Sequence, residues 1–394
     1  MAGIPSTQPS CVQPGHGIFL EHRLTNMARL DGVQVKVVAP VPYFPWKGDA
    51  FKSYSVFARV PPSEVRSNVY ITHPKYPVIP KIGMTISPLS LAVFTKLHLQ
   101  RIQASGFDFD LIDGYYMYPD GVASVILGLM LGKPVLLTAL GSDVSLLSTY
   151  KLPRAAIVWA ARRSGHVTVV CKALKDGLTR IGVAADHVRV ILHGVDLQLF
   201  RPACDRVALR RRLGLDCPTL ISVGHLIARK GHDIAIRAMS LLAGHRLLVV
   251  GDGPEERKLR RLTRDLDLEA RVTFLGHVPQ SELPLLLGAA DALVNCSDRE
   301  GIANVLLEAM ACGTPVAATP IWGSPEIVSS VDAGILFRER SVGAVVEGVC
   351  RLLSHPPDRA MTRRHAERFS WRDTAVQHVE TIQGVLEARR KVTH

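Results

Sequence analysis

Short apolar runs alternate with segments of helical spacing along most of the chain. Each run is rich in β-branched residues, which is typical of a strand buried on both faces of a sheet. We predict such strands at residues 33–39, 110–115, 134–139, 166–171, 188–193, 219–224, 246–250, 272–275, 292–296, 315–318 and 334–337. The intervening segments place apolar residues on one helical face, as at residues 233–242, 255–266 and 342–353. This alternation predicts an α/β protein with parallel sheets covered by helices.

The pattern occurs twice, and we therefore predict two consecutive doubly wound domains. A chain of 394 residues is longer than one hydrophobic core usually supports. The boundary is expected in the segment DLQLFRP at residues 196–202. We place an N-terminal domain at residues 1–198, a C-terminal domain at residues 199–370, and a long helix at residues 371–394 that packs back toward the first domain.

The first residues depart from the pattern of a doubly wound domain, which opens with an apolar strand. The sequence begins MAGIPSTQPSCVQPGHGIF, in which only Ile4 and Val12 are β-formers before Ile18. Proline cannot donate to a central ladder, so the three prolines of this stretch oppose a long strand. Either the first strand is very short, or the chain lacks its natural N-terminus, and the second alternative is our expectation.

Composition describes an ordinary globular protein. Hydrophobic residues make up 47% of the chain and charged residues 21%, which excludes intrinsic disorder. No uninterrupted run of about 18 apolar residues predicts a membrane span, and the start lacks the basic and apolar regions of a signal peptide. The seven cysteines are scattered without a C-x-x-C pair, which indicates a reducing, cytoplasmic location without disulfides or zinc.

The net charge of +12 is concentrated in acid-free stretches. No acidic residue occurs between Glu64 and Asp108, or between Asp143 and Asp176. Basic faces of this kind suit phosphates of a nucleic acid, an anionic lipid or a phosphorylated substrate. Aromatic residues are only 6% and are not interleaved with a basic cluster, so we expect no nucleic-acid partner.

Candidate chemistry gathers in the stretch REGIANVLLEAMACGTPVAATPIWGSPEIV, residues 299–328. A predicted strand ends at residue 296, and a helix is predicted at residues 304–311 after a short loop. Ligands bind outside the carboxyl ends of parallel strands, and the free N–H groups of a helix start favour a phosphate. Glu300 precedes this helix start and Glu308 lies one turn inside it, so both can accept from sugar hydroxyls. The alternative is that both glutamates are solvated surface charges.

The stretch resembles the E-x7-E signature of glycosyltransferase family 4, whose members are retaining enzymes of the GT-B fold. Further segments resemble the same family, namely VGHLIARKGHDIAIRA, VVGDGPEERKL, VTFLGHV and ILHGVDLQLFRP. The first half, with PGHGIFLEHRL, VVAPVPYFPW, YYMYPDGVAS and TALGSDV, is similar to the branch that builds exopolysaccharides and teichuronic acid. The resemblance implies two Rossmann-like domains that face a central cleft.

The resemblance also implies roles for individual residues. Glu300 would contact the donor sugar, Glu308 the ribose, and Lys230 the diphosphate. Many relatives carry arginine where this chain has His225, and whether His225 or Arg229 supplies that charge stays open. The implied catalytic residues are Glu300, Lys230 and Arg229. The implied donor-binding residues are Gly17, Gly224, His225, Gly253, His277, Val278, Gly301, Ile302, Ala303, Asn304 and Glu308.

The first half contributes the implied acceptor side. Gly15 and Gly17 match the first glycine-rich loop of the family. Asp120 lies in a turn that either lines the acceptor or is a plain loop. Asp143 either positions the acceptor or caps the following helix. Leu140 stands where many relatives carry a catalytic histidine, a departure that also motivates an inactive or truncated transferase as an alternative.

The expected reaction breaks the bond between an anomeric carbon and a nucleoside diphosphate, with UDP or GDP as the leaving group. Lys230, Arg229 and the helix start can stabilise the growing phosphate charge, so we expect no metal ion and no cofactor. A metal-dependent rival would use D-x-D, which occurs at residues 108–110 and 265–267, and we attribute both to chance. A nucleotide-sugar epimerase of the same fold is the nearest alternative enzyme.

The acceptor is expected to be a glycan or a lipid-linked glycan in polysaccharide biosynthesis. Residues 76–102, YPVIPKIGMTISPLSLAVFTKLHLQRI, are apolar, basic and acid-free. We hypothesise that this segment makes peripheral contact with an anionic membrane at its cytoplasmic face. The alternative is a buried helix behind a loop.

Overall fold

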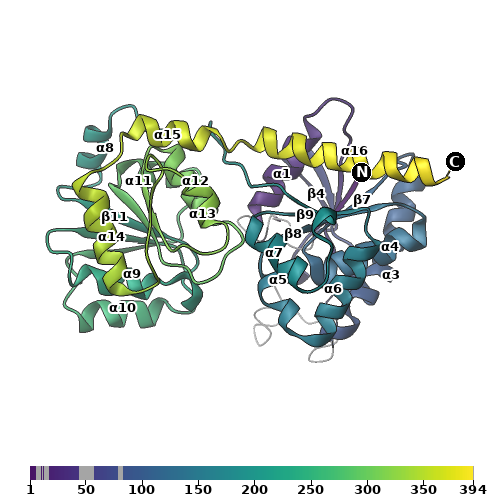
Figure 1. Cartoon of the computed structure of the whole chain (residues 1–394), viewed down its shortest axis with the longest axis horizontal. Helices are drawn as coiled ribbons and strands as arrows, with labels where there is room; N and C mark the ends of the chain where they lie inside the picture. The colour runs from purple at the N-terminus through teal and green to yellow at the C-terminus, as the bar shows by residue number, and fades with distance from the viewer. Residues whose placement is uncertain (6–9, 11, 13–16, 44–56, 79–82, 394) are drawn as a thin grey trace. The chain divides into compact units, whose positions relative to one another are not determined.

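The computed structural model describes residues 1–5, 10, 12, 17–43, 57–78 and 83–393. The chain divides into two compact units (Figure 1). Unit 1 comprises Met1–Leu192 together with Trp371–His394, and unit 2 comprises His193–Ser370. The change of unit therefore falls between Leu192 and His193, a few residues before the boundary expected from the sequence.

Unit 1 is built on an eight-stranded sheet in the order β10-β9-β8-β7-β1-β2-β5-β4. All neighbouring strands are parallel except β4 and β5. The strands are β1 (Ala2–Ile4), β2 (Lys36–Val38), β4 (Ser63–Arg66), β5 (Val69–Thr72), β7 (Ile112–Tyr115), β8 (Val135–Ala139), β9 (His166–Val169) and β10 (Val188–Val190). A separate parallel pair joins β3 (Val41–Tyr43) and β6 (Lys75–Pro77).

A first strand is present in unit 1, and it is very short. The three residues of β1 are buried and pair with β2 on one side and β7 on the other. Pro5 follows directly, which agrees with the exclusion of proline from a central ladder.

Helices cover the sheet of unit 1, and the last helix of the chain is one of them. The helices are α1 (Ile18–Ala28), α3 (Gly83–Ala104), α4 (Val122–Leu131), α5 (Ser142–Ser145), α6 (Lys151–Arg163), α7 (Lys172–Arg180) and α16 (Trp371–Thr393), with the short turns η2 (Met117–Gly121), η3 (Leu147–Thr149) and η4 (Ala185–His187). Figure 1 shows α16, in yellow, running beside α1. Ile382 and Val385 of α16 pack on Leu111 and Leu136 of the core. His378 Nε2 lies 2.9 Å from Asp113 Oδ2, and both side chains are fully buried.

Unit 2 is built on a six-stranded parallel sheet in the order β13-β12-β11-β14-β15-β16. The strands are β11 (Thr219–Val223), β12 (Arg246–Val250), β13 (Val272–Gly276), β14 (Ala292–Asn295), β15 (Val316–Ala318) and β16 (Gly334–Leu336). The helices are α8 (Arg206–Arg212), α9 (His232–Met239), α10 (Glu256–Asp265), α11 (Leu283–Ala289), α12 (Asn304–Ala311), α13 (Ser324–Ile327), α14 (Val342–Ser354) and α15 (Arg359–Glu367), with the turn η5 (Ala228–Lys230).

The strand order of unit 2 reverses between β11 and β14. Strands β11, β12 and β13 follow one another in one direction, whereas β14, β15 and β16 continue from β11 in the other. In open parallel sheets, the crevice at the carboxyl ends of such a switch point is the usual place for a ligand. A ligand site is therefore expected at the loops that follow β11 and β14.

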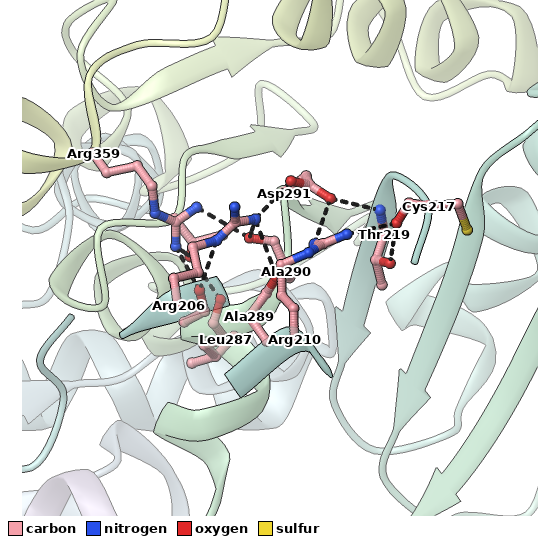
Figure 2. A network of polar contacts seen from close by, with 11 residues as sticks. Arg206, Arg210, Cys217, Thr219, Leu287, Ala289, Ala290, Asp291 and Arg359 are labelled. Carbon is pink, nitrogen blue, oxygen red and sulfur yellow. Dashed lines mark hydrogen bonds and ion pairs between the residues drawn. The ribbon is translucent and has the colours of Figure 1, made fainter. Parts of the chain in front are cut away.

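The opposite edge of the same sheet carries a cluster of arginines (Figure 2). Arg206, Arg210 and Arg359 donate to the carbonyls of residues 288–290, where α11 ends. The last carbonyls of a helix have no intrahelical partner, and cations are favourable there. Asp291 accepts from two of these arginines and from the amide of Thr219. Burial opposes its ionisation, but the Thr219 amide and the arginines hold the pKa of Asp291 below its usual value. The cluster thus stabilises the end of α11 and has a structural role.

The predicted α/β class with parallel sheets is confirmed, and each of the eleven predicted strands is present. No helix in the described ranges is long and apolar enough to cross a membrane.

Candidate functional site

Lys230 and Glu300 meet at the switch point of the unit 2 sheet. Lys230 lies in η5, which follows β11, and Glu300 lies in the loop that follows β14. Lys230 Nζ donates to Glu300 Oε1 over 2.8 Å, and both side chains are largely buried. The hydroxyl of Ser297 donates to the same oxygen. Burial opposes ionisation, but Lys230 and the Ser297 hydroxyl outweigh it and lower the pKa of Glu300. The site therefore contains a carboxylate that is ionised at neutral pH beside an ammonium group.

Two glycines allow the turns at this edge to pack against each other. Gly231 has φ 69°, and a Cβ there would lie 2.2 Å from the carbonyl oxygen of Cys296 at the end of β14. Gly253 has φ 155°, and a Cβ there would lie 2.6 Å from the carbonyl oxygen of Leu226. Only glycine adopts these conformations at such separations without strain. The turn after β12 thus packs on the segment after β11, and η5 packs on the end of β14.

Backbone contacts join η5 to the loop that bears Glu300. The amide of Asp298 donates to the carbonyl of Arg229 over 2.8 Å, and Arg229 Nη1 donates to the carbonyl of Arg299 over 3.1 Å. Arg340, from the segment after β16, donates to the carbonyl of Cys296 over 2.8 Å and to that of Ala228 over 3.4 Å. These contacts fix the separation of Lys230 and Glu300. Sequence reasoning missed Arg340, because no motif links it to Cys296 or Ala228, which lie 44 and 112 positions earlier.

Helix α12 begins beside the pair with unpaired backbone donors. Ala303 is its N-cap and makes no side-chain capping bond. Within the described part of the chain, the amides of residues 301–304 donate no hydrogen bond. The Oδ1 atom of Asn304 is held 2.8 Å from Nδ1 of His193, which fixes the first residue of the helix. Free N–H groups at a helix start, together with the helix dipole, form a site for an anion.

Glu308 lies one turn inside α12 and is only partly exposed. Burial raises its pKa to about 7, against the smaller opposing effects of a hydrogen bond from Gln280 and the charge of Lys230. Gln280 lies in the loop between β13 and α11 and was not found by sequence reasoning. Glu308 is therefore a carboxyl group that changes its charge near neutral pH, and the positive charge of Lys230 favours its ionised form.

The remaining predicted residues of unit 2 lie at the same edge of the sheet. His225 follows β11 and is exposed, with Nδ1 3.5 Å from Oδ1 of Asp252. His277, exposed, and Val278, partly buried, follow β13. The structure thus gathers at the carboxyl ends of β11 to β14 the predicted residues Gly224, His225, Arg229, Lys230, Gly253, His277, Val278, Glu300, Gly301, Ile302, Ala303, Asn304 and Glu308.

The predicted residues of the first half lie in unit 1. Gly17, with φ 74°, is the N-cap of α1, Asp120 lies buried in η2, and Gly15 is outside the described residues. Asp143 is fully buried, and its carboxylate accepts from the amides of Leu140, Gly141, Val144 and Met117. Burial raises the pKa of Asp143 although these four amides oppose the shift. The carboxylate thus organises the loop around the start of α5, although Gly141 and not Asp143 is the N-cap of that helix.

The D-x-D segments show no metal-binding geometry. Asp108 accepts from Lys133 Nζ over 2.8 Å, and Asp265 faces Arg261 on α10. Across the ranges that the structure describes, no three His, Cys, Asp or Glu side chains cluster as metal ligands do.

Comparison with known proteins covers both units. Residues 208–369 match the family described as "Glycosyl transferases group 1", and residues 19–199 match the one described as "Glycosyltransferase Family 4". The chain is 39% identical over 206 residues to the D-inositol 3-phosphate glycosyltransferase of Mycobacterium tuberculosis (strain ATCC 25618 / H37Rv). That match covers 48% of this chain and 42% of the relative, so it spans less than half the length of the curated protein.

Solved structures resemble the chain over nearly its whole length. A sucrose-phosphate synthase from Thermosynechococcus elongatus has a TM-score of 0.79 at 22% identity, with 98% of this chain and 99% of that chain covered. The Anabaena protein HepE in complex with UDP-glucose has a TM-score of 0.73 at 20% identity, with 97% and 98% covered. At these identities the likeness shows the fold, and it confirms the prediction of two Rossmann-like units.

Proposed function

Because the chain belongs to glycosyltransferase family 4, whose fold class is GT-B, we propose that it transfers a sugar from a nucleoside-diphosphate donor to a glycan or lipid-linked acceptor. The observation that carries the proposal is the Lys230–Glu300 pair beside the uncapped start of α12. Glu300, the free amides of residues 301–304 and Glu308 follow one another there, in the order of the sugar, the diphosphate and the ribose in such a donor. We assign the reaction to polysaccharide biosynthesis in the cytoplasm.

Each part of the donor has a partner in unit 2. The diphosphate is bound by Lys230 and by the amides of residues 301–304, because both present positive charge to the same region. Glu300 accepts from hydroxyls of the donor sugar. Glu308 accepts from the ribose hydroxyls, since a carboxylate offers two acceptor oxygens. The base lies against the backbone at residues 277–278, next to the loop of Gln280.

Catalysis follows from where charge develops. As the glycosidic bond to the phosphate breaks, the sugar takes on oxocarbenium character and negative charge grows on the leaving diphosphate. Lys230 and the start of α12 stabilise that charge without a metal ion, and Arg229 or His225 adds to it. The acceptor hydroxyl attacks from the side of the leaving group and gives its proton to the departing phosphate oxygen, so the configuration is retained.

The donor is proposed to be a UDP-sugar. HepE, which shares the fold of this chain, has been crystallised in complex with UDP-glucose, and this supports a UDP-linked donor. A GDP-sugar is the alternative that the loop at residues 277–280 would have to accommodate.

An activity assay tests the proposed function. Purified chain is incubated with UDP- and GDP-sugars, with and without a polyprenyl-linked acceptor, in the presence of EDTA. Acceptor-dependent release of the nucleoside diphosphate, lost in Lys230→Ala, is the expected result. Conversion of the donor to its epimer or to free sugar without acceptor would instead indicate an epimerase. A folded wild-type protein that consumes no donor would refute the proposal.

A further inference from the structure

Helix α3, Gly83–Ala104, buries one face and exposes an apolar stripe on another. Leu91, Leu99 and Ile102 point into the core of unit 1. On the outer side Ile86 is 47% exposed, Leu89 52%, Val93 44% and Leu97 58%. Residues three and four positions apart are neighbours on a helix surface, so these four side chains form one continuous row.

A row of four large aliphatic side chains is not ordinary surface. Single exposed apolar residues are common in folded proteins, but contiguous apolar patches mark sites of interaction. Helix α4 packs next to α3, as Figure 1 shows, and it exposes Leu129 and Met130. We call Ile86, Leu89, Val93 and Leu97 the α3 stripe.

Helix α3 itself carries positive charge. Residues 65–107 contain no acidic residue, and α3 carries Lys96 and Arg101. Apolar side chains flanked by cations match the chemistry of an anionic lipid surface, with acyl chains below and phosphates at the level of the headgroups.

We propose that the α3 stripe docks unit 1 on an anionic lipid bilayer. The stripe enters the boundary between headgroups and acyl chains, and the basic residues beside it bind lipid phosphates. A second copy of this chain fits the same surface less well, because a symmetric dimer would bring its like charges together. Docking gives access to a lipid-linked acceptor. That consequence rests on the proposed function, whereas the docking itself does not.

Vesicle co-sedimentation of the full chain tests the proposal. Vesicles of phosphatidylcholine alone are compared with vesicles that also contain phosphatidylglycerol, at low and at physiological salt. The variant Leu89→Glu/Leu97→Glu places two negative charges in the stripe at exposed positions, so the core is unchanged. The control is Leu241→Glu, the same substitution at a single leucine of unit 2 that is 64% exposed. Thermal unfolding and binding of UDP by calorimetry confirm that each variant is folded.

The expected result is binding of the wild type to phosphatidylglycerol vesicles, at least tenfold weaker in Leu89→Glu/Leu97→Glu and unchanged in Leu241→Glu. No sedimentation of the wild type at low salt overturns the proposal. Equal binding by the double variant also overturns it, because the attraction would then be electrostatic alone. A wild-type dimer that the double variant converts to a monomer, seen by light scattering, would assign the stripe to a second copy. Vesicle binding without any binding of nucleotide would contradict the proposed function and leave the docking in place.

Discussion

Replacing Glu308 with glutamine is predicted to stabilise the empty protein and to weaken donor binding. Burial raises the pKa of Glu308 to about 7 from an ordinary value of 4.5, so the ionised form is penalised in the folded state. A difference of about 2.5 units corresponds to about 3.4 kcal/mol, because each pKa unit is worth about 1.4 kcal/mol. Since the side chain is partly exposed, solvent screening reduces this, and we expect about 1–3 kcal/mol.

The sign of the effect depends on pH. Below pH 4.5 Glu308 is neutral in the folded and the unfolded chain, so Glu308→Gln leaves the stability unchanged there. As the pH rises through the folded pKa of about 7, the wild type loses stability that the glutamine variant keeps. Urea denaturation followed by circular dichroism at about pH 5 and about pH 8 measures the difference. Glu282→Gln, at an exposed position in the same unit, is the control and should change stability by less than about 0.5 kcal/mol.

Donor binding should change in the opposite direction. Loss of a charged acceptor of the ribose hydroxyls costs about 1.5–3 kcal/mol, which is about 10- to 100-fold in Kd. If the ribose hydroxyls bind only the ionised form of Glu308, the affinity of the wild type for the donor rises about tenfold from about pH 6 to about pH 8. The affinity of Glu308→Gln for the donor stays constant over the same range. Equal stability of the two proteins at about pH 8, or an affinity of the wild type that does not depend on pH, would refute the reasoning.

Three further changes test other parts of the site. Lys230→Ala removes a cation from the leaving phosphate and should lower kcat about 10²-fold or more, measured by release of nucleoside diphosphate. Arg340→Ala releases two carbonyls at the loop ends and should lower kcat/KM about tenfold, whereas Arg338→Ala, two residues earlier, should not. Gly231→Ala places a Cβ against a carbonyl oxygen and should cost several kcal/mol in urea denaturation, compared with about 1 kcal/mol for Gly214→Ala, whose Cβ would meet nothing. Equal effects within either pair would contradict the assigned contacts.

The sequence predicted those elements that have a strong pattern of their own. Strands such as β8 and β14 are buried along their whole length and appear as apolar runs. Strand β1 was not placed, because three residues beside a proline carry too little pattern, and its position depends on β2 and β7. Strands β3, β4 and β6 were missed for the same reason, since β4 is polar and β3 and β6 contain a proline, whereas β5 (VYIT) has a strand pattern and was overlooked.

The candidate site was predictable where one loop and one helix contain it. Glu300 and Glu308 lie close in sequence, and the rule for carboxyl ends of parallel strands places them correctly. The contacts that fix them come from distant segments. Gln280 reaches Glu308 from the loop after β13, and Arg340 reaches the loop ends from beyond β16. Such contacts arise from tertiary packing, and no periodic pattern in the sequence predicts them.

The most direct test of the central claim is calorimetric binding of nucleoside diphosphates and their sugars, with EDTA present. Wild type is compared with Glu308→Ala and with Glu282→Ala as the control. A donor site at the start of α12 predicts binding of UDP or GDP that the control retains and Glu308→Ala loses by tenfold or more. Binding of every nucleotide with equal affinity by Glu308→Ala, or no binding by a folded wild type, would contradict a nucleotide-sugar site at this place in the fold.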